Sequence, residues 1–199
     1  MSIIKKNNNE RVMVFVDLQN VERKMQDFFS AGIIGAKVDY EELIAKLVGE
    51  RDLVAAYVFD SCCENDPKFK FIIALQHIGF RAVIRKFDKH QIEQKEVDVA
   101  LATRLLSGAY RDLYDTAIVV SGDRDFIPAI EEVQSIGKKV ETASFSRCTS
   151  YSMEYVPDTF TRLDDLGIVD ITDCRAVYEE MREMCMASFE SLAENGGIA

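Results

Sequence analysis

Short apolar runs alternate along this chain with longer stretches in which apolar and polar residues recur at helical spacing. Four runs rich in β-branched and aromatic residues show little strict polar alternation, which predicts parallel strands buried on both faces. These runs cover residues 12–16, 53–59, 81–87 and 116–120. A fifth strand is predicted over residues 139–145.

Helical stretches fill the spaces between these runs. Asp39 followed by Glu42 resembles a capping box, which opens a helix through Val48. Pro67 suits the first turn of a second helix, which ends near residue 78. Residues 97–113 form a third and longer amphipathic stretch.

Three glycines are placed to end helices just before a strand begins. Gly49, Gly79 and Gly137 each suit the left-handed position that follows a helix. Strands that alternate with helices indicate βαβ units with right-handed crossovers. We therefore predict an α/β fold, with a mainly parallel sheet of about five strands covered by helices on both faces.

The length and the change of composition near the C-terminus indicate one domain with an appendage. A chain of 199 residues suits a single domain, which we place at residues 1–168. Residues 169–199 are acidic and rich in methionine, and they predict an amphipathic helix followed by a flexible tail. We expect this helix to pack on the domain, or to bind a second copy or another protein.

Charge is distributed unevenly along the chain. The net charge is -10, and the stretch from residue 154 to the end has eleven acids against three arginines. Residues 62–95 have the opposite balance, with seven basic residues against four acids. The basic residues are Lys68, Lys70, Arg81, Arg85, Lys86, Lys89 and Lys95. They suit either binding to nucleic-acid phosphates or an ordinary solvated face.

Several classes of protein do not fit the sequence. It has no apolar leader and no apolar run near the roughly 20 residues that a membrane span needs. Its five cysteines include no CxxC pair, so they predict neither a disulfide framework nor a zinc knuckle. We expect a cytoplasmic protein that does not enter a membrane.

Four aspartates are predicted to meet at one edge of the sheet. Asp17 follows the first predicted strand directly, and Asp123 and Asp125 follow the strand over residues 116–120. Asp98 lies in the first turn of the long helix. Ligands in such folds bind beyond the carboxyl ends of the strands, so three elements converge on one site.

Carboxylate oxygens suit hard cations, and Mg²⁺ or Mn²⁺ is therefore the expected cofactor. Such an ion activates water for in-line hydrolysis of a phosphodiester bond. No arrangement for a nucleophilic side chain is visible: His77 suits an ordinary helix position, and His90 lies in a polar loop. The sequence therefore favours hydrolysis by water.

Three of the four aspartates also have a structural alternative. Asp17 suits the N-cap of a helix starting near residue 21, and Asp125 suits the N-cap of a helix through residue 136. Asp98 suits the first turn of its helix because the helix dipole favours an acid there.

Neighbouring polar residues are candidates for binding the substrate. Asn20 either binds a phosphate, orients a water or caps its own helix, and Ser121 either holds a water on the metal or closes its turn. Lys95 is placed to bind a phosphate, unless it is an ordinary loop lysine. Lys86 and Lys89, in the basic stretch, are further candidates for binding the phosphates of a nucleic acid. Leu18 and Phe126 are expected in the core.

Four segments together resemble the NYN domain family, in particular its LabA-like group, within the PIN-like nuclease superfamily. They are VFVDLQN, KEVDVALATRLL, YDTAIVVSGDRDFIPAIEEVQSIGKKVE and YSMEYVPDTFTRL, and the resemblance extends from Val12 to about Leu166. It implies a Rossmann-like PIN fold, an acidic pocket for Mg²⁺ or Mn²⁺, and ribonuclease activity or, in some members, RNA binding alone. The matching positions are Asp17, Asn20, Asp98, Ser121, Asp123 and Asp125.

Two departures from the family and three alternatives bear on the activity. Glu96 stands where relatives often have glycine, and Arg104 where they often have an acid, so the local field is less negative. The first alternative to a metal-dependent endoribonuclease is a module that binds RNA or protein without cleaving. A haloacid-dehalogenase-like phosphatase is disfavoured because its DxD follows the first strand. A receiver-type phospho-acceptor using Asp17 and Asp60 lacks its lysine.

Overall fold

The computed structural model describes residues 9–29, 37–62, 68–85, 95–145 and 149–170. The predictions for Lys86, Lys89, His90 and the C-terminal helix fall outside these ranges. No helix in the described ranges is long and apolar enough to cross a membrane.

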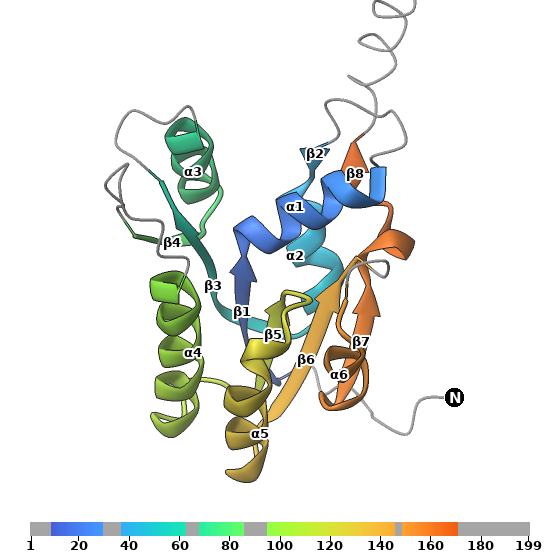
Figure 1. The fold of residues 1–199 in the computed structure, drawn as a ribbon. Coiled ribbons are helices and arrows are strands. Elements are labelled where there is room, and N and C mark those ends of the chain that lie inside the picture. Colours follow the sequence, from blue (N-terminus) through green and yellow to red (C-terminus); the bar gives the residue numbers. More distant parts are fainter. Residues whose placement is uncertain (1–8, 30–36, 63–67, 86–94, 146–148, 171–199) are drawn as a thin grey trace, which may run out of the picture.

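Six parallel strands form the central sheet, in the order β4-β3-β1-β5-β6-β7 (Figure 1). Their bounds are β1 Arg11–Asp17, β3 Asp52–Ser61, β4 Arg81–Arg85, β5 Thr116–Val120, β6 Lys139–Ser144 and β7 Thr159–Arg162. A separate pair of short antiparallel strands consists of β2 Lys37–Val38 and β8 Val169–Asp170.

Helices cover both faces of the central sheet. One face packs against α1 Leu18–Phe29, α2 Tyr40–Val48 and α3 Lys68–His77. The other packs against α4 Lys95–Tyr110, α5 Ile127–Ser135 and α6 Tyr151–Tyr155. Two 3₁₀ turns, η1 Arg124–Phe126 and η3 Leu163–Leu166, complete the described elements.

The core consists of two layers because successive side chains of a strand point to opposite faces. In β1, Val14 and Val16 belong to the layer beneath α1 and α2. Met13 and Phe15 belong to the layer beneath α4 and α5. Each central strand is thus apolar on both faces, as the uninterrupted apolar runs predicted.

The predicted α/β architecture is confirmed, with all five predicted strands in place. The sequence missed β7, which pairs with β6 at the sheet edge, because its residues are only partly buried and form no apolar run. The long helix begins at Lys95, two residues before its predicted start, and ends at Tyr110, three residues before its predicted end. Leu18 and Phe126 are buried, as predicted.

Local signals in the sequence placed several helix ends correctly. Asp39 caps α2 by accepting a hydrogen bond from the Glu42 backbone N–H at 2.9 Å. Gly49, Gly79 and Gly137 all have positive φ angles, of 62°, 108° and 82°. These angles strain residues with a Cβ atom, so the glycines end their helices as expected.

The path of the chain places a switch point between β1 and β5. From β1 the strands proceed through β3 to the edge at β4, and the chain then returns to β5 on the other side of β1. The helices that precede this return, α1 to α3, cover one face of the sheet. The helix that makes the return, α4, and the later α5 and α6 cover the other face. Ligands of open α/β sheets bind beyond the carboxyl ends of the strands at such a point.

Candidate functional site

Asp17 and Ser121 are brought together by the register of the two strands at the switch point. Val16 of β1 lies opposite Val120 of β5, so the residues that follow also lie side by side. The buried Ser121 hydroxyl donates to Asp17 Oδ2 at 3.1 Å, and its oxygen accepts from the Asp123 backbone N–H at 3.2 Å. Ser121 therefore links the end of β1 to the loop after β5.

Asn20 makes a second link between the same two segments. The Gly122 backbone N–H donates to Asn20 Oδ1 at 3.0 Å, and the Asn20 backbone N–H donates to Asp17 Oδ1 at 3.1 Å. The Asn20 side-chain oxygen therefore holds the β5 loop and does not cap its own helix. Asp17 also caps α1, so its predicted structural role and its place in the acidic site coexist.

Asp123 and Asp125 occupy the turn that leads from β5 to α5. Asp123 Oδ1 accepts from the Asp125 backbone N–H at 3.0 Å and caps η1. The alternative that Asp125 caps the following helix is wrong, because α5 has Phe126 at its N-cap with no side-chain capping bond. Asp125 is exposed and Asp123 is half-buried.

Asp98 joins this group from the first turn of α4. Burial raises the pKa of Asp98, and the negative charges of Asp123 and Asp125 raise it further. Arg104 lies elsewhere, since its guanidinium carbon is 5.3 Å from the ring centroid of Tyr57 on β3. In the described part of the chain, Arg104 forms no salt bridge with any of the four aspartates.

Asp17 has the largest resolved perturbation in the group. Its exposed fraction is 6%, and burial raises its pKa to about 6. Hydrogen bonds from Asn20 and Ser121 lower the pKa, whereas the charges of Asp98 and Asp123 raise it. Such a shift means that the site favours added positive charge, either a proton or a cation.

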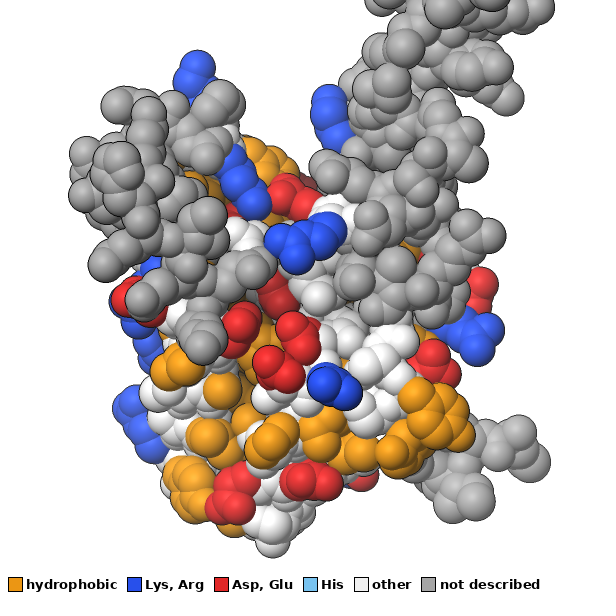
Figure 2. Space-filling view, in the orientation of Figure 1, with side chains coloured by type: hydrophobic (Ala, Val, Ile, Leu, Met, Phe, Trp, Pro, Cys, Tyr) orange, Lys and Arg blue, Asp and Glu red, His pale blue; other side chains and the backbone are white. Residues whose placement is uncertain are grey.

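The four aspartates lack compensating ion pairs within the part of the chain that the structure describes. No Lys or Arg there forms a salt bridge with Asp17, Asp98, Asp123 or Asp125. Figure 2 shows acidic side chains gathered at the centre of one face.

The donor set fits an open magnesium-type site better than a closed cage. Across the described ranges, no three acidic, histidine or cysteine side chains are already arranged to enclose a metal ion. Both Asp17 oxygens also accept hydrogen bonds. Mg²⁺ commonly keeps several waters and binds through one or two carboxylates plus substrate phosphates. Carboxylates that are near one another without enclosing an ion are compatible with that mode.

Asp60, at the end of β3, differs from the four aspartates. It is fully buried, and its Oδ2 lies 2.7 Å from Lys68 Nζ, which also pairs with Glu22 at 2.9 Å. Its charge is therefore compensated inside the protein. This arrangement gives Asp60 a structural role and disfavours the receiver-type alternative.

The predicted basic residues are placed only in part. Lys95 is the first residue of α4. Its side chain lies outside the part of the chain that the structure describes, and so do Lys86 and Lys89. His77 is an exposed residue at the end of α3, as expected. Cys62, which follows β3, is buried.

The sequence did not predict the groove beside Asp125. It is an open groove lined by Arg124, Asp125, Ile127, Pro128 and Ser152. The start of α6 lies against the acidic loop, because the Ser150 backbone N–H donates to the Gly122 carbonyl oxygen at 3.1 Å. Only the folded chain brings residues from η1 and α6 together here.

Comparisons with known proteins identify both a family and a fold. The sequence profile of the NYN domain matches residues 11–164. A solved structure of a protein of unknown function from Vibrio parahaemolyticus is similar, with a TM-score of 0.71 and 24% sequence identity. The similarity covers 84% of this chain and 100% of that one, and it shows the shared fold alone. The comparison with curated proteins gave no match.

Proposed function

Because the chain belongs to the NYN domain family of the PIN-like nuclease superfamily, we propose that it is a ribonuclease that depends on a divalent metal ion. NYN domains are generally nucleases. The observation that carries the proposal is the group of aspartates at the switch point, whose negative charges raise the pKa of Asp17 and of Asp98. A strongly perturbed pKa in such a position is typical of a functional site.

The four aspartates have one collective role in this proposal. Asp17, Asp98, Asp123 and Asp125 would hold Mg²⁺ or Mn²⁺ at the edge of the sheet. Such an ion, when bound, lowers the pKa of a water molecule and stabilises the charge that develops on the leaving oxygen. The aspartates thereby direct hydrolysis to a phosphodiester bond of RNA.

Asn20 and Ser121 act as positioning residues in this scheme. Their bonds join Asp17 to the β5 loop that carries Asp123, so the two carboxylates keep a fixed separation. Their predicted role in binding substrate stays a prediction. Small displacements of catalytic groups lower rates strongly, so we expect loss of either link to reduce turnover.

The test is cleavage of a labelled single-stranded RNA by the purified chain in Mn²⁺. We expect Asp123→Asn to reduce the rate at least about 100-fold, which corresponds to about 3 kcal/mol. The asparagine keeps an oxygen for the Asp125 N–H, so the turn is preserved. Asp165→Asn, an exposed acid on η3, serves as the matched control and should cleave normally. Equal rates for wild type and Asp123→Asn would refute the proposal.

A second candidate is an NYN module that binds RNA or a protein but cleaves weakly or not at all. The observation that favours it is the pair of departures at Glu96 and Arg104. Tight RNA binding by the wild-type chain, with no cleavage beyond that of Asp123→Asn, would support this candidate.

RNA binding can be tested separately, by measuring how the affinity for RNA depends on the salt concentration. Each phosphate contact on a single strand contributes roughly 0.7 to the slope of log affinity against log salt. Replacing both Lys86 and Lys89 with glutamine should therefore flatten the slope by about 1.4. An unchanged slope would mean that the RNA follows another surface.

A further inference from the structure

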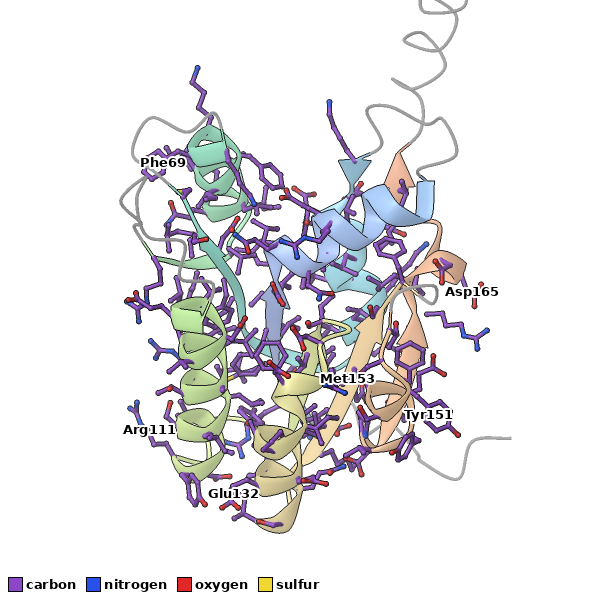
Figure 3. All side chains as sticks on the ribbon, viewed as in Figure 1. Phe69, Arg111, Glu132, Tyr151, Met153 and Asp165 are labelled. Atoms are coloured by element: carbon purple, nitrogen blue, oxygen red, sulfur yellow. The ribbon has the colours of Figure 1, made fainter. Side chains whose placement is uncertain are left out.

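Two tyrosines on α6 present an aromatic surface to solvent. Tyr151 and Tyr155 are 79% and 62% exposed, and their ring centroids are 4.8 Å apart. Tyr151 is the most exposed large hydrophobic side chain among the residues described. It projects outward from α6 in Figure 3. Contiguous exposed apolar surface can mark a site where another molecule binds.

The helix that carries these rings is held firmly against the core. Met153 is fully buried between the tyrosines in sequence, and its carbonyl oxygen accepts from Thr142 Oγ1 at 2.8 Å. The Val156 carbonyl oxygen accepts from Gln134 Nε2 at 3.1 Å. The rings are therefore presented by a fixed element, which reduces the entropy lost when a ligand binds.

The aromatic surface adjoins the acidic group. Tyr151 directly follows Ser150, which is bonded to Gly122 in the loop of the acids, and Ser152 lines the groove together with Asp125. Figure 2 shows a cationic side chain beside the central acids and a hydrophobic patch further to the right.

Arg124 supplies a positive charge in the same groove. It is exposed, and within the described part of the chain it forms no salt bridge. A guanidinium suits a phosphate because its planar fork matches the phosphate oxygens. A ligand with both a phosphate and a flat ring would match Arg124 and the two tyrosines together.

We propose that α6 and η1 form a subsite for single-stranded RNA, with a base stacked on Tyr151 and the adjoining phosphate on Arg124. This inference rests on the proposed function, since the strand continues from the subsite to the acidic group. Aromatic rings stack on any base, but only on one that is not already stacked in a duplex. The subsite therefore selects single strands over double helices without reading their sequence.

The absence of tryptophan from the chain allows a direct test of stacking. Tyr151→Trp, combined with Asp123→Asn to prevent cleavage, places one fluorophore on α6. A single-stranded oligonucleotide should quench its fluorescence, and a duplex of the same sequence should quench it much less. Tyr110→Trp is the matched control, because Tyr110 is 62% exposed but lies at the far end of α4. Equal quenching at both positions would overturn the proposal.

Affinity measurements separate this inference from the proposed function. In the Asp123→Asn background, Tyr151→Ala should weaken binding of a fluorescent single-stranded RNA at least about fivefold. Tyr151→Phe should bind normally, as should Tyr110→Ala, and Arg124→Gln should flatten the salt slope by roughly 0.7. If the wild-type chain cleaves RNA while Tyr151→Ala keeps full affinity, the subsite is wrong and the nuclease stands. If the wild-type chain neither binds nor cleaves RNA, both fail.

Discussion

The charged residues at the amino end of the central sheet form ion pairs, whereas the four aspartates beyond the carboxyl ends of β1 and β5 form none with the described Lys and Arg residues. At the amino end, the Arg51 guanidinium donates two hydrogen bonds to Glu141, at 2.8 Å and 3.0 Å. It also donates to the carbonyl oxygens of Leu47 and Val48, at 2.6 Å and 2.9 Å, at the C-terminus of α2. The charge of Arg51 is thus compensated by Glu141 and by the carbonyl groups at the negative end of the α2 dipole.

The rest of the amino end follows the same pattern. Arg11 Nη2 lies 2.7 Å from Asp115 Oδ1, and this hydrogen-bonded pair lowers the pKa of Asp115 to about 2. The Lys139 ammonium lies 3.3 Å from Glu10, which is buried beside it. These pairs favour the charged forms in the folded state.

At the carboxyl end, by contrast, Asp17, Asp98, Asp123 and Asp125 form no salt bridge with any described Lys or Arg. Burial and neighbouring aspartates raise the pKa of Asp17 to about 6, and they also raise the pKa of Asp98. Charges that repel one another reduce the stability of the fold, so their presence points to a role in binding rather than in folding. The comparison therefore separates the charges that hold the sheet together from those that we assign to function.

The largest effect is expected from breaking a pair at the amino end. Glu141→Gln leaves the Arg51 guanidinium, whose side chain is only 1% exposed, without its counter-charge. Removing one partner of a buried pair costs about 3–5 kcal/mol. Urea unfolding should show that loss, whereas RNA cleavage per folded molecule should not change. Glu131→Gln, at an exposed position on α5, provides the control. A loss below about 1 kcal/mol would mean that the pair is not needed for folding.

The next effect concerns metal binding at the carboxyl end. A ligand that binds only the folded state at a hundredfold excess over its Kd adds about 3 kcal/mol to the free energy of unfolding. Mn²⁺ should therefore raise the melting temperature of the wild-type chain. Asp98→Asn should reduce this increase, because it removes one carboxylate, and Glu141→Gln should preserve it. An identical melting temperature with and without millimolar Mn²⁺ would contradict the metal site.

The smallest effect concerns pH in the metal-free protein. The pKa of Asp17 is higher in the folded chain, at about 6, than its ordinary value of 3.8. The folded state therefore binds the proton more tightly, and this carboxyl adds stability as the pH falls. From pH 7 to pH 5 the gain is about 1 kcal/mol. Asp115 makes no opposing change in this range, because its contribution is lost only as the pH falls from about 4 towards 2.

The measurement for this prediction is urea unfolding in EDTA at pH 7 and at pH 5. We expect Asp17→Asn to be more stable than the wild-type chain at pH 7, and the difference to shrink at pH 5. A difference that stays constant between the two pH values would show that Asp17 does not titrate in this range.

Much of the fold and part of the site could be predicted from local sequence. The apolar runs located five of the six strands in the central sheet, and the motifs identified a family that the profile match confirms. Asp17 and Asp123 were placed correctly at strand ends, because a strand and the residue after it are neighbours in the chain. By contrast, β7 has no apolar run of its own and exists because β6 offers an edge to pair with.

Local sequence was enough to locate five of the six strands of the central sheet, several helix ends and the acids that follow strands. These properties depend on side-chain volume, polarity and backbone freedom within a few residues. Which strands lie side by side depends on the tertiary structure. It placed β1 beside β5, so that Ser121 bonds to Asp17 across 104 residues of chain and Asn20 holds Gly122. It also placed α6 with its two tyrosines beside the acids, because contacts so distant in sequence depend on register and packing.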